Sequence, residues 1–328
     1  MKKIVILALG VLALNGLKAQ QDPQYTQWMY DKLSFNPAYA GFACDECFGA
    51  GGHALTLLYR DQWDGLNRDP KTALLNYNGN FGNAFGSGNL GAGVTFYSDN
   101  LGQERNSLIR INAAYHIPLS GGNILSAGIG LGQFSKTLGN DWIAIDDPAN
   151  DPLIPNEEST ASAFDANLGV YFTRPGEYYV GLSATHLSQA ELENLSITVN
   201  RHYYFMGGYN YDVTPGYLTL RGNVLAKTDL TEYIADINVN ALFNDMIWAG
   251  LTYRTQDAVA PMAGFKYSWD AESETQITHY CFRLGYSYDA TTSALRNYSA
   301  GSHEVFATLC LNLEPIILRT KFSNPRFL

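Results

Sequence analysis

The feature that most constrains this chain is a two-residue alternation of apolar and polar side chains, repeated in runs of about ten residues from 51 to 313. In residues 233–243, for instance, every second residue is apolar, and Asp236, Asn238 and Asn240 alternate with them. Successive side chains of a strand point to opposite faces of a sheet, so each run has one apolar and one polar face. The alternation therefore predicts an all-β chain.

About 14 such runs are separated by clusters of Gly, Asn, Asp and Pro, which are typical of turns. An even number of antiparallel strands of this length is typical of a bacterial transmembrane β-barrel. Short connections such as 174–176 and 243–245 alternate with long ones such as 137–161 and 290–301, as periplasmic turns alternate with outer loops. The predicted strands are 53–60, 71–80, 89–98, 104–117, 123–136, 162–174, 177–187, 200–212, 216–227, 231–243, 246–256, 258–269, 276–289 and 302–313.

Composition favours a membrane barrel over a soluble β-sandwich or a lipocalin-like barrel. Charged residues make up 16% of the chain, against roughly 25% in soluble domains, and there are 22 Tyr and 31 Gly. A wall between lipid and a wet lumen carries few charges and collects tyrosine at the interfaces. Glycines such as Gly91 and Gly93 fall in a predicted strand, where they indicate tight packing rather than a phosphate-binding loop.

Residues 1–19 have the order of a cleaved signal peptide: Lys2 and Lys3, an apolar run over 4–14, and the small Ala19 before Gln20. The apolar run is too short for a membrane-spanning helix, which needs roughly 20 residues. Without this segment, the 21 basic residues fall by three to 18 against 31 acidic ones. This acidic balance excludes nucleic acid as an expected partner. The signal peptide and the barrel pattern together predict an outer-membrane location.

Two segments lie outside the predicted wall of residues 53–313. In the N-terminal segment, 20–52, Asp22 and Pro23 predict the start of a short helix that carries Tyr25 and Trp28 and ends at Asn36 and Pro37. The other segment is the tail, 314–328. We expect both at the periplasmic mouth, where the helix either packs against the barrel or faces a partner.

Four cysteines in an exported chain favour disulfides. Cys44 and Cys47 form a CxxC, for which a local disulfide, or no role, is favoured over a redox or zinc site because a second metal-ligand pair is missing. Cys281 and Cys310 fall nearly opposite each other on the last two predicted strands. A cross-strand disulfide between them is one interpretation.

Catalysis, cofactors and resident metals are not expected. The six histidines form no pair at metal-binding spacing, and no GxSxG motif is present. His303 and Glu304 could be half of a hydrolase site, but no matching nucleophile is evident. The acidic stretch 146–158 could bind calcium, although a solvated loop is favoured because the spacing of a calcium-binding loop is absent.

Several short blocks follow one another along the chain. They are Gln21-Asp22-Pro23-Gln24-Tyr25-Thr26-Gln27-Trp28-Met29-Tyr30, Phe35-Asn36-Pro37-Ala38-Tyr39-Ala40-Gly41, Arg60-Asp61-Gln62-Trp63-Asp64-Gly65, Asp69-Pro70-Lys71-Thr72, Gly301-Ser302-His303-Glu304 and Asn324-Pro325-Arg326-Phe327. In this order the blocks resemble the PorP/SprF family of type IX secretion system membrane proteins. One departure from the family is an insertion at 44–52, about which the resemblance says nothing.

This resemblance implies an outer-membrane barrel of Bacteroidota that supports the export of large surface proteins, including gliding adhesins. It implies no catalysis. Some family members hold the C-terminal domain of a secreted client at the cell surface, and others connect to the periplasmic machinery. The alternative is a porin-like channel, which is disfavoured because inward Tyr, Arg and Asn would narrow the lumen.

We therefore expect the long outer loops to bind a client, and residues 22–41 and 314–328 to bind a periplasmic partner. Since the first and last strands close a barrel, Arg60, Trp63, His303 and Glu304 are predicted to form one cluster, either as a seam or as a partner contact. The other candidate partner-binding residues are Tyr25, Trp28, Asn36, Pro37, Tyr39, Arg326 and Phe327.

Overall fold

The structure, a computed structural model, describes residues 22–48, 52–82, 89–141, 157–195, 197–273 and 276–315. The predicted signal peptide and most of the C-terminal tail, including Arg326 and Phe327, lie outside the described residues, as does most of the acidic stretch. Among the described residues, no helix is long and apolar enough to cross a membrane.

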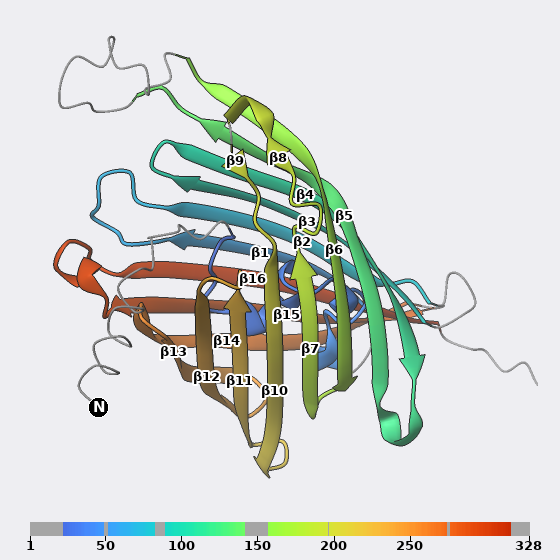
Figure 1. The fold of residues 1–328 in the computed structure, drawn as a ribbon. Helices are drawn as coiled ribbons and strands as arrows, with labels where there is room; N and C mark the ends of the chain where they lie inside the picture. Colours follow the sequence, from blue (N-terminus) through green and yellow to red (C-terminus); the bar gives the residue numbers. More distant parts are fainter. Residues whose placement is uncertain are drawn as a thin grey trace, which may run out of the picture.

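Fourteen antiparallel strands form a closed barrel, which confirms the predicted architecture (Figure 1). Neighbours in the barrel are neighbours in the sequence, and β16 closes the ring by pairing with β1. The barrel strands are β1 (His53–Asp61), β2 (Lys71–Asn80), β3 (Leu90–Leu101), β4 (Glu104–Pro118), β5 (Ile124–Leu138), β6 (Ser159–Arg174), β7 (Tyr178–Thr185), β10 (His202–Thr214), β11 (Leu218–Thr228), β12 (Tyr233–Phe243), β13 (Ile247–Arg254), β14 (Ala258–Glu272), β15 (Gln276–Thr291) and β16 (Ser302–Pro315).

The connections differ at the two ends of the barrel. The short-turn end holds 175–177, 215–217 and 244–246, and both the start of β1 and the end of β16 lie there. The long-loop end holds 62–70, 186–201 and 292–301. The loop 186–201 contains a small sheet that the sequence did not predict, β8 (Glu191–Leu192) with β9 (Ile197–Thr198), and the 3-10 turn η6 (Glu193–Leu195).

The wall alternates as its sequence predicted. Exposed apolar side chains such as Leu57, Ile111 and Val239 point outward, while buried polar ones such as Arg110 and Asn238 point into the lumen. Lipid requires an apolar outer surface, which these side chains provide. Lipid also requires that every backbone N–H and C=O be paired, and a closed barrel meets this condition because it has no free strand edge.

The N-terminal segment lies inside the barrel and not at its mouth, so the predicted position was wrong (Figure 1). We call residues 22–48 the plug. The predicted α-helix was also wrong: the plug contains the 3-10 turns η1 (Trp28–Tyr30), η2 (Lys32–Ser34) and η3 (Pro37–Tyr39), followed by a single α-helical turn, α2 (Asp45–Phe48). Further 3-10 turns are η4 (Ser120–Gly122) and η7 (Ala294–Asn297).

Wall side chains explain why the plug needs no continuous helix. Arg110 donates to the carbonyl of Ser34 at 2.7 Å, Ser183 to that of Phe35 at 2.6 Å, and Ser126 to that of Ala38 at 2.8 Å. Buried backbone groups must be paired, and here the wall provides the partners that a helix would otherwise supply. Periodicity alone cannot reveal such partners.

Two wall glycines let the plug approach closely. A Cβ at Gly91 of β3 would overlap the backbone of Ala40, and a Cβ at Gly128 of β5 would overlap the backbone of Ala38. The tight packing predicted for Gly91 is thus a contact with the plug. Because backbone and not a flexible side chain occupies the space, a larger residue must displace the plug.

We expect Gly128→Val to lower the free energy of unfolding by at least about 1–3 kcal/mol, the usual cost of overpacking. Urea titration of the purified barrel, followed by tryptophan fluorescence, measures this change. Gly222→Val is the matched control, since no atom lies within 4 Å of the added Cβ. Equal stability of both variants would mean that the plug does not pack against β5.

Candidate functional site

The most strongly buried charges of the lumen surround Arg60 of β1, whose side chain is fully buried. Its guanidinium lies 2.7 Å from the carboxylate of Asp289 and 3.2 Å from that of Glu304. It also donates to the hydroxyl of Thr26 in the plug at 3.0 Å. Buried charges are stable only when they are paired and hydrogen-bonded, and Arg60 meets both conditions.

Glu304 of β16 connects this pair to the backbone of the plug. Its carboxylate accepts the N–H of Thr26 at 2.8 Å and that of Gln27 at 2.7 Å. Arg60 and Glu304 are direct partners in the pairing of β1 with β16. One ion pair therefore lies on the barrel seam and also holds the first turn of the plug.

Arg254 of β13 extends the network around the lumen. It lies 3.0 Å from Asp236 of β12 and 3.4 Å from Asp289, and it donates to the carbonyl of Tyr25 at 3.1 Å. The two-residue alternation predicts Asp236 on a polar strand face, where it is buried, but does not connect it with Arg60. One signal in the sequence could have revealed the network. Several predicted strands carry a charged residue at an inward position near the same end of the barrel.

The predicted cluster of Arg60, Trp63, His303 and Glu304 is only partly assembled. His303 follows Ser302 and precedes Glu304, so strand alternation turns it to the outer face, where it lies 2.7 Å from the hydroxyl of Tyr286. Trp63 lies in the loop after β1, and its N–H donates to the hydroxyl of Ser302 at 3.0 Å. Only Arg60 and Glu304 meet in the lumen.

The candidate residues of the plug are all buried. Trp28 is fully buried, and Tyr39 packs edge-on against Tyr171 with ring centroids 5.4 Å apart. Asn36 caps η3 by accepting the N–H of Ala38 at 2.9 Å, with Pro37 at the first position of that turn. While the plug occupies the lumen, Tyr25, Trp28, Asn36, Pro37 and Tyr39 are lumen contacts, inaccessible to a partner.

The disulfides connect the plug to the last hairpin, so the predicted pairings were wrong. Cys44 is bonded to Cys310 of β16 and Cys47 to Cys281 of β15, with Cα–Cα distances of 5.8 Å and 6.2 Å. Cys281 and Cys310 are direct cross-strand neighbours, as the sequence indicated. The helical turn α2 lies against both, and each plug cysteine reaches one wall cysteine.

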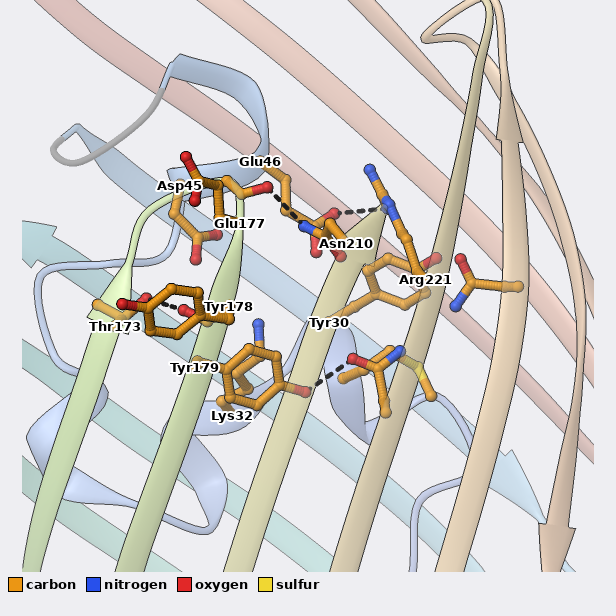
Figure 2. A pocket seen from close by; sticks show the side chains of 14 residues that line it. Tyr30, Lys32, Asp45, Glu46, Thr173, Glu177, Tyr178, Tyr179, Asn210 and Arg221 are labelled. Carbon is orange, nitrogen blue, oxygen red and sulfur yellow. Dashed lines mark hydrogen bonds and ion pairs between the residues drawn. The ribbon is translucent and has the colours of Figure 1, made fainter. Parts of the chain in front are cut away.

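Ion pairs also hold the plug near the disulfides, and the pair of Glu46 with Arg221 is drawn in Figure 2. The carboxylate of Glu46 lies 3.0 Å from Arg221 and 3.4 Å from Arg283. Burial alone would raise the pKa of Glu46, but the two guanidinium groups outweigh it and hold the pKa at about 2. Glu46 therefore stays ionised at neutral pH.

A small polar cavity remains between the plug and strands β6, β7, β10 and β11 (Figure 2). Lys32 lies beside it, with its ammonium 4.5 Å from the ring centroid of Tyr179 and 5.1 Å from that of Tyr39. The water-sized space in the cavity is about 20 Å³, which holds about one water. The filled lumen can bind and position groups, but this cavity is too small for a solute path.

We expect Arg60→Ala to destabilise the barrel by about 3–5 kcal/mol, because Glu304 would keep a buried charge without its partner and Asp289 would keep only Arg254 as an ion-pair partner, at 3.4 Å. Chemical unfolding measures the loss. In the control, Arg174→Ala, the lost ion pair with Glu177 is about half exposed, and the change should stay below about 1 kcal/mol. Similar losses in the two variants would contradict a central role for Arg60.

We expect non-reducing peptide mapping by mass spectrometry to recover Cys44 linked to Cys310 and Cys47 linked to Cys281. Alkylation before digestion prevents exchange between the four neighbouring sulfurs. A fully reduced sample, in which the four peptides separate, is the control. Recovery of Cys44 linked to Cys47 would contradict the anchored plug.

The chain is similar to solved structures at low sequence identity. The CymD monoaromatic hydrocarbon channel is 13% identical over 92% of this chain and 95% of its own, with a TM-score of 0.46. A Pseudomonas aeruginosa FadL homologue is 9% identical over 88% and 94%, with a TM-score of 0.47. No curated protein matches the sequence significantly.

The family comparison is more specific. The family model described as type IX secretion system membrane protein PorP/SprF matches residues 17–309, which is most of the chain. The matched region includes the plug, Arg60 and the Ser302-His303-Glu304 block, and so covers both sides of the seam network. The chain therefore belongs to the PorP/SprF family of type IX secretion system membrane proteins.

Proposed function

We propose that this protein is an outer-membrane component of the type IX secretion system that binds a secreted surface protein, the periplasmic machinery, or both. In this role it supports export of the client and its attachment to the surface. The observation that carries the proposal is the lumen, which is filled by the plug in a barrel of this family.

A filled lumen favours binding over passage. The plug is held near the long-loop end by Arg60 and Glu304, and towards the short-turn end by two disulfides. For the plug to leave the lumen, the buried ion pairs and both disulfides would have to break. The porin-like alternative therefore has little support from the geometry.

The long-loop end offers exposed apolar side chains suited to a protein partner. Leu230 is 78% exposed and Tyr298 is 71% exposed, and each lies in a connection between strands. Tyrosine is enriched among the residues that anchor protein interfaces, and an exposed Leu adds apolar area that a partner can cover. We assign this end to the cell exterior and the client.

The short-turn end is assigned to the periplasm, where β1 begins and β16 ends. The buried plug is unsuited to contacts with a periplasmic partner, so the earlier hypothesis for residues 22–41 needs revision. The tail, with Arg326 and Phe327, remains our candidate for that contact. Among the described residues of the short-turn end, Tyr217 and Met246 are 57% and 49% exposed in their turns.

A pull-down of the tagged barrel from solubilised outer membranes, read by mass spectrometry, tests this assignment. Wild type is expected to recover one large surface protein with a type IX C-terminal domain. Leu230→Ala/Tyr298→Ala should reduce that recovery by roughly tenfold, the effect of losing about 1.4 kcal/mol at an interface. Tyr217→Ala/Met246→Ala is the matched control and should retain the client.

Equal recovery of the client by both double variants would show that the client does not bind Leu230 and Tyr298 at the long-loop end. Recovery of the barrel alone, together with ion conductance of wild type in planar bilayers, would favour the porin-like channel instead.

A further inference from the structure

Three potential metal ligands from separate parts of the chain converge at the long-loop end of the lumen. They are Asp22 at the start of the plug, His186 directly after β7, and His202, the first residue of β10. One ligand atom from each lies within 4.8 Å of the others. The histidine side chains are 3% and 4% exposed and that of Asp22 is 12% exposed, so the group is built into the interior.

Asp22 stands between the two imidazoles. Its Oδ1 is 2.7 Å from Nε2 of His186, and its Oδ2 is 3.6 Å from Nδ1 of His202. The hydroxyl of Tyr204 donates to Oδ2 at 2.6 Å, which fixes the orientation of the carboxylate. The carboxylate is therefore held where it can share a cation with both rings.

A second carboxylate lies behind His186, as is common for metal-bound histidines. Asp165 Oδ1 is 3.1 Å from Nδ1, on the opposite side of the ring from Asp22. An outer carboxylate fixes the orientation of a ligating imidazole and raises its basicity. Lys227 and Arg110 are nearby cations: the ammonium of Lys227 is 3.1 Å from the backbone carbonyl of Asp22, and Arg110 lines the cavity beside Asp22 and His186.

The group also contains buried polar atoms without hydrogen-bond partners. Nδ1 of His202 makes no hydrogen bond, because Asp22 lies 3.6 Å away. Nδ1 of His186 and the carboxylate of Asp165 lie 3.1 Å apart but are not aligned for a hydrogen bond. Such atoms are rare in protein interiors because each one costs free energy. A cation placed among Asp22, His186 and His202 would give Nδ1 of His202 a partner. Nδ1 of His186 would stay on the side of Asp165, as it is in the structure.

We propose that Asp22, His186 and His202 bind one divalent transition-metal ion, with zinc preferred. Two imidazole nitrogens and one carboxylate suit zinc, whereas calcium and magnesium prefer oxygen ligands alone. A cavity of about 20 Å³ adjoins Asp22, Thr185, His186 and Tyr204 and has room for a water as fourth ligand. The ion would join the start of the plug to β7 and β10, independently of the role in secretion.

Zinc titration of the purified barrel tests the site. A Strep-tagged wild type, stripped with EDTA and kept oxidised so that the four cysteines remain in disulfides, is expected to bind one zinc per chain by calorimetry and elemental analysis. His186→Ala, His202→Ala and Asp22→Asn should each weaken binding at least tenfold. Co²⁺ loading of wild type should give the absorption bands of a four-coordinate site, and these should be lost in the variants.

His116→Ala is the matched control, because His116 is another buried lumen histidine but lies beside Phe42 and Ser126. It should bind zinc as wild type does. Heat-modifiable migration in gels establishes that each variant is folded, and Asp22→Asn keeps the size of the side chain if an alanine variant fails. No zinc uptake by wild type, or uptake unchanged in folded Asp22→Asn and His202→Ala, would overturn the proposal and leave a buried ion pair of His186 with Asp22.

Discussion

The buried ion pair between Arg60 and Glu304 unites the parts of this molecule. It joins the first strand to the last, and Glu304 also accepts two backbone N–H groups of the plug. Removing water from charged groups is costly, so such a pair is stable only with further hydrogen bonds, and Thr26 and Asp289 provide them. Closure of the wall and seating of the plug thus depend on the same carboxylate.

The lumen follows from this arrangement. A barrel of this strand number lies between small barrels packed with side chains and large ones that hold water. Here the plug fills the interior with aromatic residues such as Tyr30, whose ring stacks on Phe306 at 4.9 Å, while inward Arg, Asn and Ser residues bind its backbone. The wall is apolar toward lipid and polar toward the plug, so one strand serves two environments.

Much of the fold could be predicted because strand alternation is a local property. The strand count, the inward polar faces of β11 and β12 and the facing of Cys281 and Cys310 all followed from periods of two and from hairpin geometry. The plug was mispredicted because the partners of its backbone are wall residues such as Arg110 and Ser183, far away in sequence. The proposed metal site could not be predicted for the same reason. Asp22, His186 and His202 are far apart in the sequence and follow no metal-binding motif, and they meet only in the closed barrel.

The two disulfides also bear on how the molecule is assembled. They span 266 and 234 residues, so each closes a covalent ring that contains almost the whole wall. In an oxidised chain, the plug is linked to β15 and β16 before the barrel closes, so the strands must pair around it. In a reduced chain, the strands could pair before the plug is bound. Oxidation before insertion would thus tether the plug to the last hairpin while the strands pair around it.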